Sequence, residues 1–169
     1  RKDEEQDGDD KELGGLDATM FRALAARGNY LSQDRSDIRY SVKEISRKIA
    51  KPRVKDFDAI LRLARYLKGK ERFVTLFGYQ DGDAKHSNKF INVWVDTEFA
   101  GCLETRKSTS GGVLMLNQHV IKTWSVTQDV IALSSGEAEY YGMVRGAAQA
   151  LGIRSFIADW GLQRKIRIR

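Results

Sequence analysis

The feature that most constrains the fold is a change in hydrophobic period near residue 73. Between residues 17 and 69, apolar side chains recur every three or four positions, which is the period of amphipathic helices. From Phe73 onward they alternate with polar side chains, which is the period of strands with one buried face. The change predicts an α/β chain, with a helical segment at residues 17–69 and a sheet-containing domain at residues 72–169.

Three helices are expected in the first part. Asp17 is placed to cap the first, Pro52 to end the second and Gly69 to close the third. Residues 1–16 are acidic and almost free of apolar side chains, so we expect a disordered lead-in. Basic side chains flank the apolar face of the third helix, either as a solvated outer face or as a phosphate-binding surface. They are Arg62, Arg65 and Lys68.

The second part is expected to contain strands, a long helix and the opening of a further strand. The clearest strand is Phe90–Asp96, whose two faces carry Ile91, Val93 and Val95 on one side and Asn92, Trp94 and Asp96 on the other. The other expected elements are a strand at Phe73–Tyr79, a polar loop at Asp81–Asn88, a hairpin of Gly112–Leu116 and His119–Ser125, a helix at Ser135–Trp160 and a strand opening in residues 164–169.

Composition narrows the functional classes. Residues 1–12 carry a net charge of −4 and the other 157 residues carry +10, which favours polyanionic partners, nucleic acid first. A single cysteine and two histidines exclude an internal disulfide framework and a cysteine- or histidine-rich metal site. No apolar run approaches the roughly 20 residues of a membrane span, and no signal peptide is evident, so we expect an intracellular protein.

Two acidic side chains are candidate metal ligands. Asp96 ends an apolar strand, where an unpaired carboxylate is costly to bury unless something binds it, although an exposed strand-end aspartate needs no ligand. Glu137 follows Ser134 at the spacing of a capping box, which gives it a structural role. Glu139 lies about 200° further around the helix, on a face of small residues suited to packing on a sheet. Asp96 and Glu139 could converge on Mg²⁺ or Mn²⁺, which prefer carboxylate oxygens.

Several ordered motifs resemble the Pol polyproteins of copia-type retrotransposons. Val95–Gly101 followed by Arg106–Gly111 resembles the signature Y-S-D-A-D-W-A-G…D-R-K-S-T-S-G, and Ala132–Tyr140 is similar to A-L-S-S-T-E-A-E-Y. The further matches are Ile121–Ser125 with Gln128, Asn29–Leu31, Asp37–Ile38, Ser46–Arg47, Lys51–Pro52 and Arg65–Gly69. The matches extend over residues 17–163, and their common order makes the resemblance specific.

The resemblance implies a function. Residues 17–69 would be a thumb- or connection-like segment of the reverse transcriptase. Residues 72–169 would be an RNase H-like domain with three antiparallel strands, a helix and an incomplete fourth strand. Such a domain cuts the RNA of RNA–DNA hybrids with two Mg²⁺ or Mn²⁺ ions. The family's first carboxylate falls on Asp96 and its helix carboxylate on Glu139.

The resemblance also implies partners. These are RNA–DNA hybrid and the remainder of the polyprotein, without a membrane or a small-molecule cofactor, in the cytoplasm or nucleus and not secreted. Arg106 and Lys107 join the three helical bases as candidate nucleic-acid contacts.

The end of the chain departs from the family pattern. Family members carry a third catalytic aspartate on the strand after the long helix and a fourth acid beyond it, whereas the sequence stops at Arg169 inside that expected strand. Asp159 precedes the turn at Gly161 and cannot take the third place. We therefore expect a ribonuclease in the longer parent and no useful cleavage by the 169-residue chain alone. The alternatives are a catalytically inactive fragment that binds nucleic acid and a relic without function.

Overall fold

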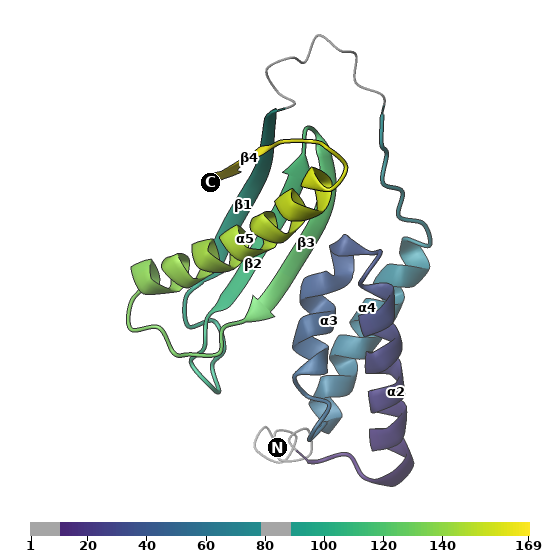
Figure 1. The fold of residues 1–169 in the computed structure, drawn as a ribbon. Coiled ribbons are helices and arrows are strands. Elements are labelled where there is room, and N and C mark those ends of the chain that lie inside the picture. The colour runs from purple at the N-terminus through teal and green to yellow at the C-terminus, as the bar shows by residue number, and fades with distance from the viewer. Residues whose placement is uncertain (1–10, 79–88) are drawn as a thin grey trace. The chain divides into compact units, whose positions relative to one another are not determined.

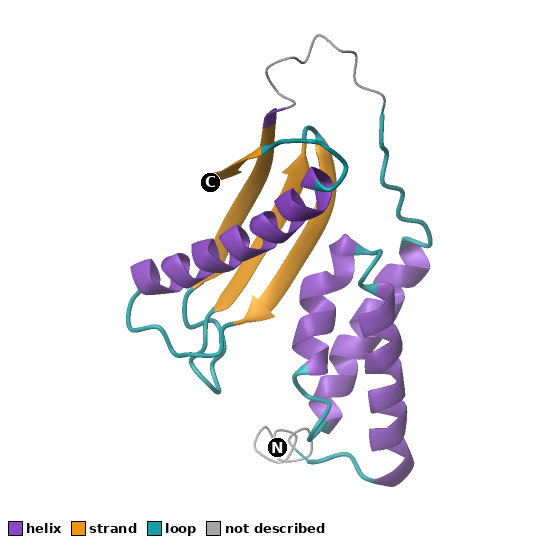
Figure 2. Cartoon of the chain, in the orientation of Figure 1, coloured by secondary structure: helices purple, strands orange, loops and turns teal. Residues whose placement is uncertain are grey.

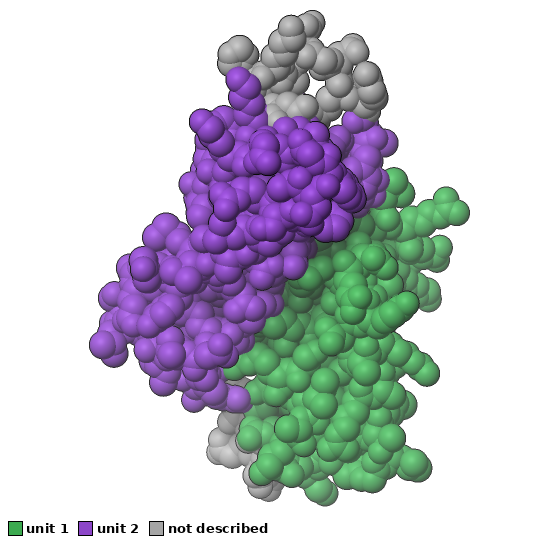
Figure 3. Space-filling view, in the orientation of Figure 1, with its two compact units in different colours: residues 1–74 green, residues 75–169 purple. Residues whose placement is uncertain are grey.

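A computed structural model of the chain describes residues 11–78 and 89–169. The chain divides into two compact units, Arg1–Val74 and Thr75–Arg169, which Figure 3 shows in different colours. The described elements of the first unit are helices, and those of the second are strands and one long helix (Figure 2). The predicted α/β class is confirmed.

The first unit is built from three α-helices with a shared apolar core. They are α2 (Gly15–Leu31), α3 (Arg39–Ser46) and α4 (Phe57–Gly69), with short 3-10 turns at Ser36–Ile38 and Val54–Asp56. The helical stripes meet around Phe21, Ala25, Ile45 and Ile60. Phe21 also packs edge-on against the Phe57 ring, with the two ring centroids 5.8 Å apart.

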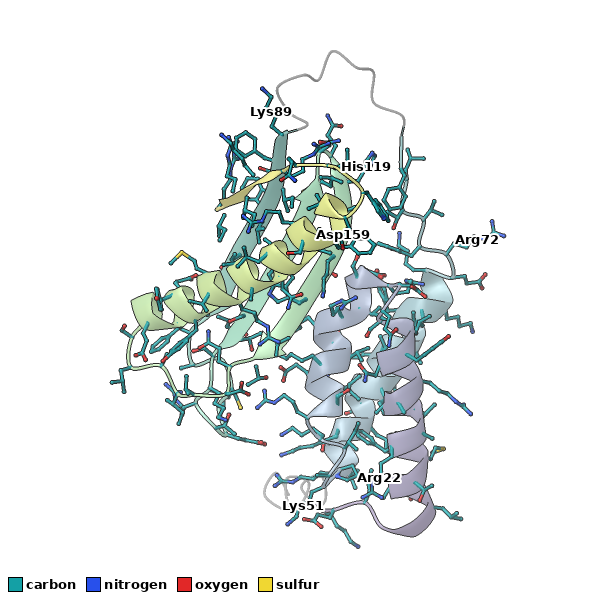
Figure 4. The ribbon with its side chains drawn as sticks, viewed as in Figure 1. Arg22, Lys51, Arg72, Lys89, His119 and Asp159 are labelled. Carbon is teal, nitrogen blue, oxygen red and sulfur yellow. The ribbon has the colours of Figure 1, made fainter. Side chains whose placement is uncertain are left out.

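The start of this unit differs from the prediction at two points. Helix α2 begins after Gly14, ahead of Asp17, and no side chain caps it. The lead-in is also ordered where the structure describes it, because the Leu13 N–H donates to the carbonyl of the buried Pro52 at 2.8 Å. Residues 1–10 lie outside the described part of the chain. In the same segment, the Arg22 side chain (Figure 4) donates to the carbonyls of Ile49 and Ala50, which follow α3.

The second unit is a mixed four-stranded sheet with one helix across it (Figure 1). Its elements are β1 (Phe90–Glu98), β2 (Thr109–Leu116), β3 (His119–Thr127), α5 (Ser135–Ala158) and β4 (Lys165–Ile168). The strand order is β3-β2-β1-β4, in which β1 pairs antiparallel with β2 and parallel with β4, and β2 pairs antiparallel with β3. The predicted hairpin is confirmed, and Asn117 takes a positive φ of 57° in its turn.

Small residues let α5 lie directly on the sheet. Gly142, Gly146 and Ala150 form a buried row along the helix, above a core that includes Ile91 and Val93. A Cβ atom at Gly146 would come within 2.9 Å of Val95 Cγ2 and 3.2 Å of Val93 Cγ1. The helix therefore approaches β1 more closely than any side chain would allow.

The strand predicted at Phe73–Tyr79 is wrong over its described residues. Residues 73–78 have no regular structure, and the apolar side chains among them are 41% to 84% exposed. Alternation produces a strand only where one face is buried against a partner. Phe73 instead lies near the Arg35 guanidinium, 5.6 Å from Cζ to the ring centroid. Tyr79 and the predicted loop at 81–88 lie outside the described residues.

Candidate functional site

Asp96 lies near the carboxyl end of β1, on the face that α5 leaves uncovered. It pairs with Gly111 of β2, and its Oδ1 accepts a hydrogen bond from the Thr97 N–H at 3.0 Å. The alternation predicted for this strand is confirmed: Ile91 and Val93 are fully buried beneath α5, whereas Asp96 is exposed. The carboxylate is therefore open to a ligand from solvent.

The two glutamates at the start of α5 have different environments. Ser134 is the N-cap, and its Oγ accepts a hydrogen bond from the Glu137 N–H at 3.1 Å. The Glu137 carboxylate accepts from the Leu133 N–H at 2.7 Å, one residue earlier than in the predicted capping box. Glu139 is half-buried, and no hydrogen bond or ion pair with another described residue occupies it. Glu137 therefore caps the helix, whereas the Glu139 carboxylate has no hydrogen-bond or ion-pair partner among the described residues.

Glu139 and Asp96 belong to segments that meet at one end of the sheet. A Cβ atom at Gly142, one helical turn after Glu139, would press against the Thr97 hydroxyl, and Thr97 directly follows Asp96. The edge of β1 that β4 covers is paired only as far as Val95, whose N–H donates to the Arg169 carbonyl at 2.9 Å. Figure 1 shows the first turns of α5 projecting past β1 on this same side. A cation reached by both carboxylates would lie at this uncovered edge, and their convergence stays a prediction.

The donor set suits a hard cation but is small. Within residues 11–78 and 89–169, no group of three or more His, Cys, Asp and Glu side chains is placed to hold a metal ion. Two carboxylates leave most of the six ligands of Mg²⁺ to water, which makes binding weak. Asp159 lies at the opposite end of α5 from Glu139 (Figure 4) and contributes nothing here.

A buried polar cluster positions the first turn of α5. The Gln128 side-chain amide donates to Ser110 Oγ at 2.9 Å and to the Ala138 carbonyl at 2.8 Å. Ser108 is also buried and accepts from the Ala100 N–H at 3.0 Å. In the sequence these residues are recognisable only as parts of the family motifs, and no buried hydrogen bonds were predicted for them. The sequence signal for such a network is the run of hydroxyl side chains at 108–110, directly after the basic pair Arg106 and Lys107.

The candidate nucleic-acid contacts occupy two separate places. Arg62, Arg65 and Lys68 are exposed along α4 of the first unit. Arg106 and Lys107 lie in the loop between β1 and β2, where Arg106 takes a positive φ of 55°. The buried Cys102 organises that loop, because its carbonyl accepts from the Arg106 N–H and its N–H donates to the Lys107 carbonyl. Nothing in the structure tests whether these bases contact phosphate.

The first unit contains a charged network that sequence reasoning did not identify. Arg35 donates two hydrogen bonds to the Asp37 carboxylate, at 3.0 and 2.8 Å, and a third to the Lys70 carbonyl. The Tyr66 hydroxyl donates to Asp37 at 2.8 Å. Hydrogen bonding from Arg35 lowers the pKa of Asp37, and hydrogen bonding to Asp37 raises the pKa of Tyr66. The network ties the end of α4 to the turn before α3.

Known proteins resemble the chain in sequence. The uncharacterized mitochondrial protein AtMg00810 of Arabidopsis thaliana is 33% identical over 135 residues, which are 79% of this chain and 53% of that protein. Retrovirus-related Pol polyproteins of three plant transposons also match. The polyprotein of transposon TNT 1-94 from Nicotiana tabacum is 28% identical over 131 residues, 78% of this chain and 9% of its own length.

A third kind of relative is short. The secreted RxLR effector protein 161 of Plasmopara viticola is 30% identical over 117 residues, 69% of this chain and 78% of its own length. The chain thus spans about half of the Arabidopsis protein and under a tenth of the tobacco polyprotein. No protein-family model matches the chain, and no solved structure matches it. No helix among the described residues is both long and apolar enough to span a membrane.

Proposed function

The chain belongs to the retrovirus-related Pol polyproteins of copia-type transposons, and on that premise we propose that residues 75–169 serve in hydrolysis of the RNA strand of RNA–DNA hybrids. The observation that carries the proposal is that β1 and α5 bring Asp96 and the turn bearing Glu139 to one end of the sheet. The strand order β3-β2-β1-β4, with a parallel last strand, supports an RNase H-like domain. The helices of residues 15–69 would be the preceding thumb- or connection-like segment of the reverse transcriptase.

The proposed chemistry assigns a role to each carboxylate. Asp96 and Glu139 would hold Mg²⁺ or Mn²⁺ at the uncovered edge of β1, where both are accessible to solvent. A bound divalent ion would supply Lewis acidity and a lowered water pKa for attack on the phosphodiester. The buried hydrogen bonds from Gln128 to Ser110 and Ala138 would keep Glu139 at a fixed height beside β1. The exposed Arg106 would hold a substrate phosphate.

The register of β4 extends this site. In the parallel ladder Phe90 lies opposite Lys165 and Val93 lies opposite Ile168. Continued without a bulge, the ladder would bring the second position after Arg169 level with Asp96. We expect a longer protein of this family to carry an aspartate there, completing a site with three carboxylates. Sequencing the transcript past this point would test the expectation, and an apolar residue at each of the first few positions would contradict it.

Cleavage of labelled hybrid is the direct test. A longer polyprotein segment should cut hybrid RNA in about 5 mM Mg²⁺ or Mn²⁺, a typical excess for weak carboxylate sites, and Asp96→Asn or Glu139→Gln should abolish cutting. Glu137→Gln is the matched control, because it changes a neighbouring carboxylate that caps the helix. The 169-residue chain should not cleave, since two carboxylates hold the ions poorly. Cleavage by this chain that Asp96→Asn removes would show a complete enzyme instead.

Binding without cleavage is the second candidate function. The net charge of +10 outside residues 1–12 favours it, together with the exposed bases of α4. Hybrid affinity should fall with salt, with a log–log slope of up to about −0.9 for each neutralised phosphate. Neutralising Arg62, Arg65 and Lys68 should flatten that slope, whereas Arg27→Gln on α2 should not. If the chain neither binds nor cleaves hybrid, the result would favour the alternative that it is a relic without function.

We further propose that the segment acts inside the cell, in the cytoplasm or nucleus, joined to the rest of the polyprotein and without a small-molecule cofactor. The match to Pol polyproteins supports this setting. The relative in Plasmopara viticola provides the contrast, because it is a secreted effector protein. Imaging a tagged polyprotein in cells that express it would test the proposal, and accumulation in the medium would contradict it.

A further inference from the structure

The face of the sheet opposite α5 carries an unusual set of side chains. Strand alternation brings Phe90 and Trp94 of β1 onto this face, with Arg167 and Arg169 of β4 beside them. The four residues line one shallow hollow together with Asn92 and Asn117. The Trp94 side chain is 45% exposed. A face made of rings, guanidinium groups and amides differs from an ordinary solvated sheet surface, which carries mixed charges and few aromatic rings.

Each arginine stacks on one of the two rings. Arg167 Cζ lies 3.9 Å from the Phe90 ring centroid, and Arg169 Cζ lies 4.8 Å from the Trp94 ring centroid. Neither arginine makes an ion pair within the described part of the chain. A guanidinium stacked by its plane keeps its N–H edges free to bind an anion. The two pairs are therefore preformed positions for an anionic group beside an aromatic ring.

The hollow also holds an acceptor without a donor. The Asn117 side-chain oxygen is buried and has no hydrogen-bond partner among the described residues. An acceptor without a partner is costly in a folded protein unless a ligand or water supplies the donor. Asn92 adds a second amide to the same hollow. Amide groups beside rings and guanidinium groups match the edges, faces and phosphates of nucleotides.

We propose that this open face binds single-stranded nucleic acid. Bases would stack on the Phe90–Arg167 and Trp94–Arg169 pairs, and phosphates would bind Lys165, Arg167 and Arg169 along β4. Single strands fit better than duplex, because only unpaired bases expose their faces to side chains on a sheet. An apolar protein segment fits worse, because it would desolvate two guanidinium groups without pairing them. This inference rests on the proposed function in hydrolysing RNA–DNA hybrids, but the residues that it uses have no role in the cleavage step.

Fluorescence anisotropy with labelled oligo-dT and oligo-U of about twelve nucleotides would test this, since single-strand sites usually cover about 4–16 nucleotides. Trp94→Ala should weaken binding about tenfold, the loss of one base–aromatic stack. Trp160→Ala is the matched control, because Trp160 is 67% exposed after α5 and away from this face. Arg169→Gln should make the log–log salt slope shallower by about 0.7, and Arg154→Gln on α5 should not.

Equal losses in Trp94→Ala and Trp160→Ala, or no binding of either oligonucleotide, would overturn the inference. A thermal melt of each variant guards against misfolding, and Arg169→Gln changes only an exposed side chain and keeps the backbone hydrogen bonds of Arg169 to β1. Sedimentation that showed a dimer broken by Trp94→Ala would also overturn it, by making the face a self-association surface. The two proposals can fail separately. If Asp96→Asn abolishes hybrid cleavage while Trp94→Ala leaves oligonucleotide binding unchanged, the proposed function stands and only this inference is overturned.

Discussion

The two faces of the four-stranded sheet carry different kinds of side chain. The face under α5 is closed by a row of small helix residues and by the buried Trp124. The opposite face exposes Trp94, two stacked arginines and Asp96. Because β1 alternates between them, neighbouring residues of one strand are in turn packed under α5 and exposed on the open face, where we propose ligand binding. Substitutions on the first face should therefore change stability, and substitutions on the second should change binding.

The two tryptophans give the largest contrast. Trp124 is 8% exposed in the core and Trp94 is 45% exposed on the open face. Trp124→Ala should lower the free energy of unfolding by about 3–5 kcal/mol, because it leaves a large cavity. Trp94→Ala should cost about 1 kcal/mol or less, the scale of an exposed cation–π contact. Urea unfolding of both variants measures this, and similar losses in the two would abolish the distinction between the faces.

Two glycines of α5 test how close the helix lies to the sheet. Gly146→Ala should destabilise by about 1–3 kcal/mol, because the new methyl group would overlap the side chains of Val95 and Val93. Gly152→Ala should instead stabilise by about 0.5–1 kcal/mol, since its Cβ would meet no other atom within 4 Å and alanine is the better helix former. Thermal melts should show opposite signs. A shift in the same direction for both would contradict the packing.

The two glutamates at the start of α5 should differ less in their effect on the free energy of unfolding. Glu137→Ala should cost about 0.5–2 kcal/mol, because the Leu133 N–H loses its acceptor. Glu139→Ala should be neutral or slightly stabilising in chelator, because no described partner is lost and any repulsion with Asp96 is relieved. Denaturant unfolding in chelator separates them. Equal destabilisation by the two substitutions would contradict the assignment of Glu139 as a metal ligand without a structural role.

The helical unit should lose stability in acid in part through Asp37. The pKa of Asp37 is lowered by hydrogen bonding from Arg35, so its contribution to stability is complete above the unfolded value of about 3.9 and is lost as pH falls through the lower folded value. Asp37→Asn should reduce the melting temperature of this unit at neutral pH, and the gap from wild type should close below about pH 4. Asp34→Asn, in the turn that ends α2, is the control. A gap that stays constant into acid would contradict the assignment.

Much of the second unit could be predicted from local pattern. The alternation in β1, the hairpin and the capped helix were all recognisable, because each depends on residues close together in the chain. The predicted strand at Phe73 failed because alternation alone cannot supply a partner strand. The buried hydrogen bonds of Gln128 were missed because its partners, Ser110 and Ala138, come from distant elements.

Local sequence patterns were enough to predict the α/β class, the two faces of β1, the position of the long helix and the motifs that contain Asp96 and Glu139. Local periodicity and capping carry that information, since both reflect which side chains must be buried. Contacts between distant segments make β4 pair parallel with β1, with Val93 opposite Ile168. Packing of α5 on the Val93 and Val95 face leaves Trp94 exposed on the other face. These features depend on contacts between residues far apart in the chain, which no local pattern encodes.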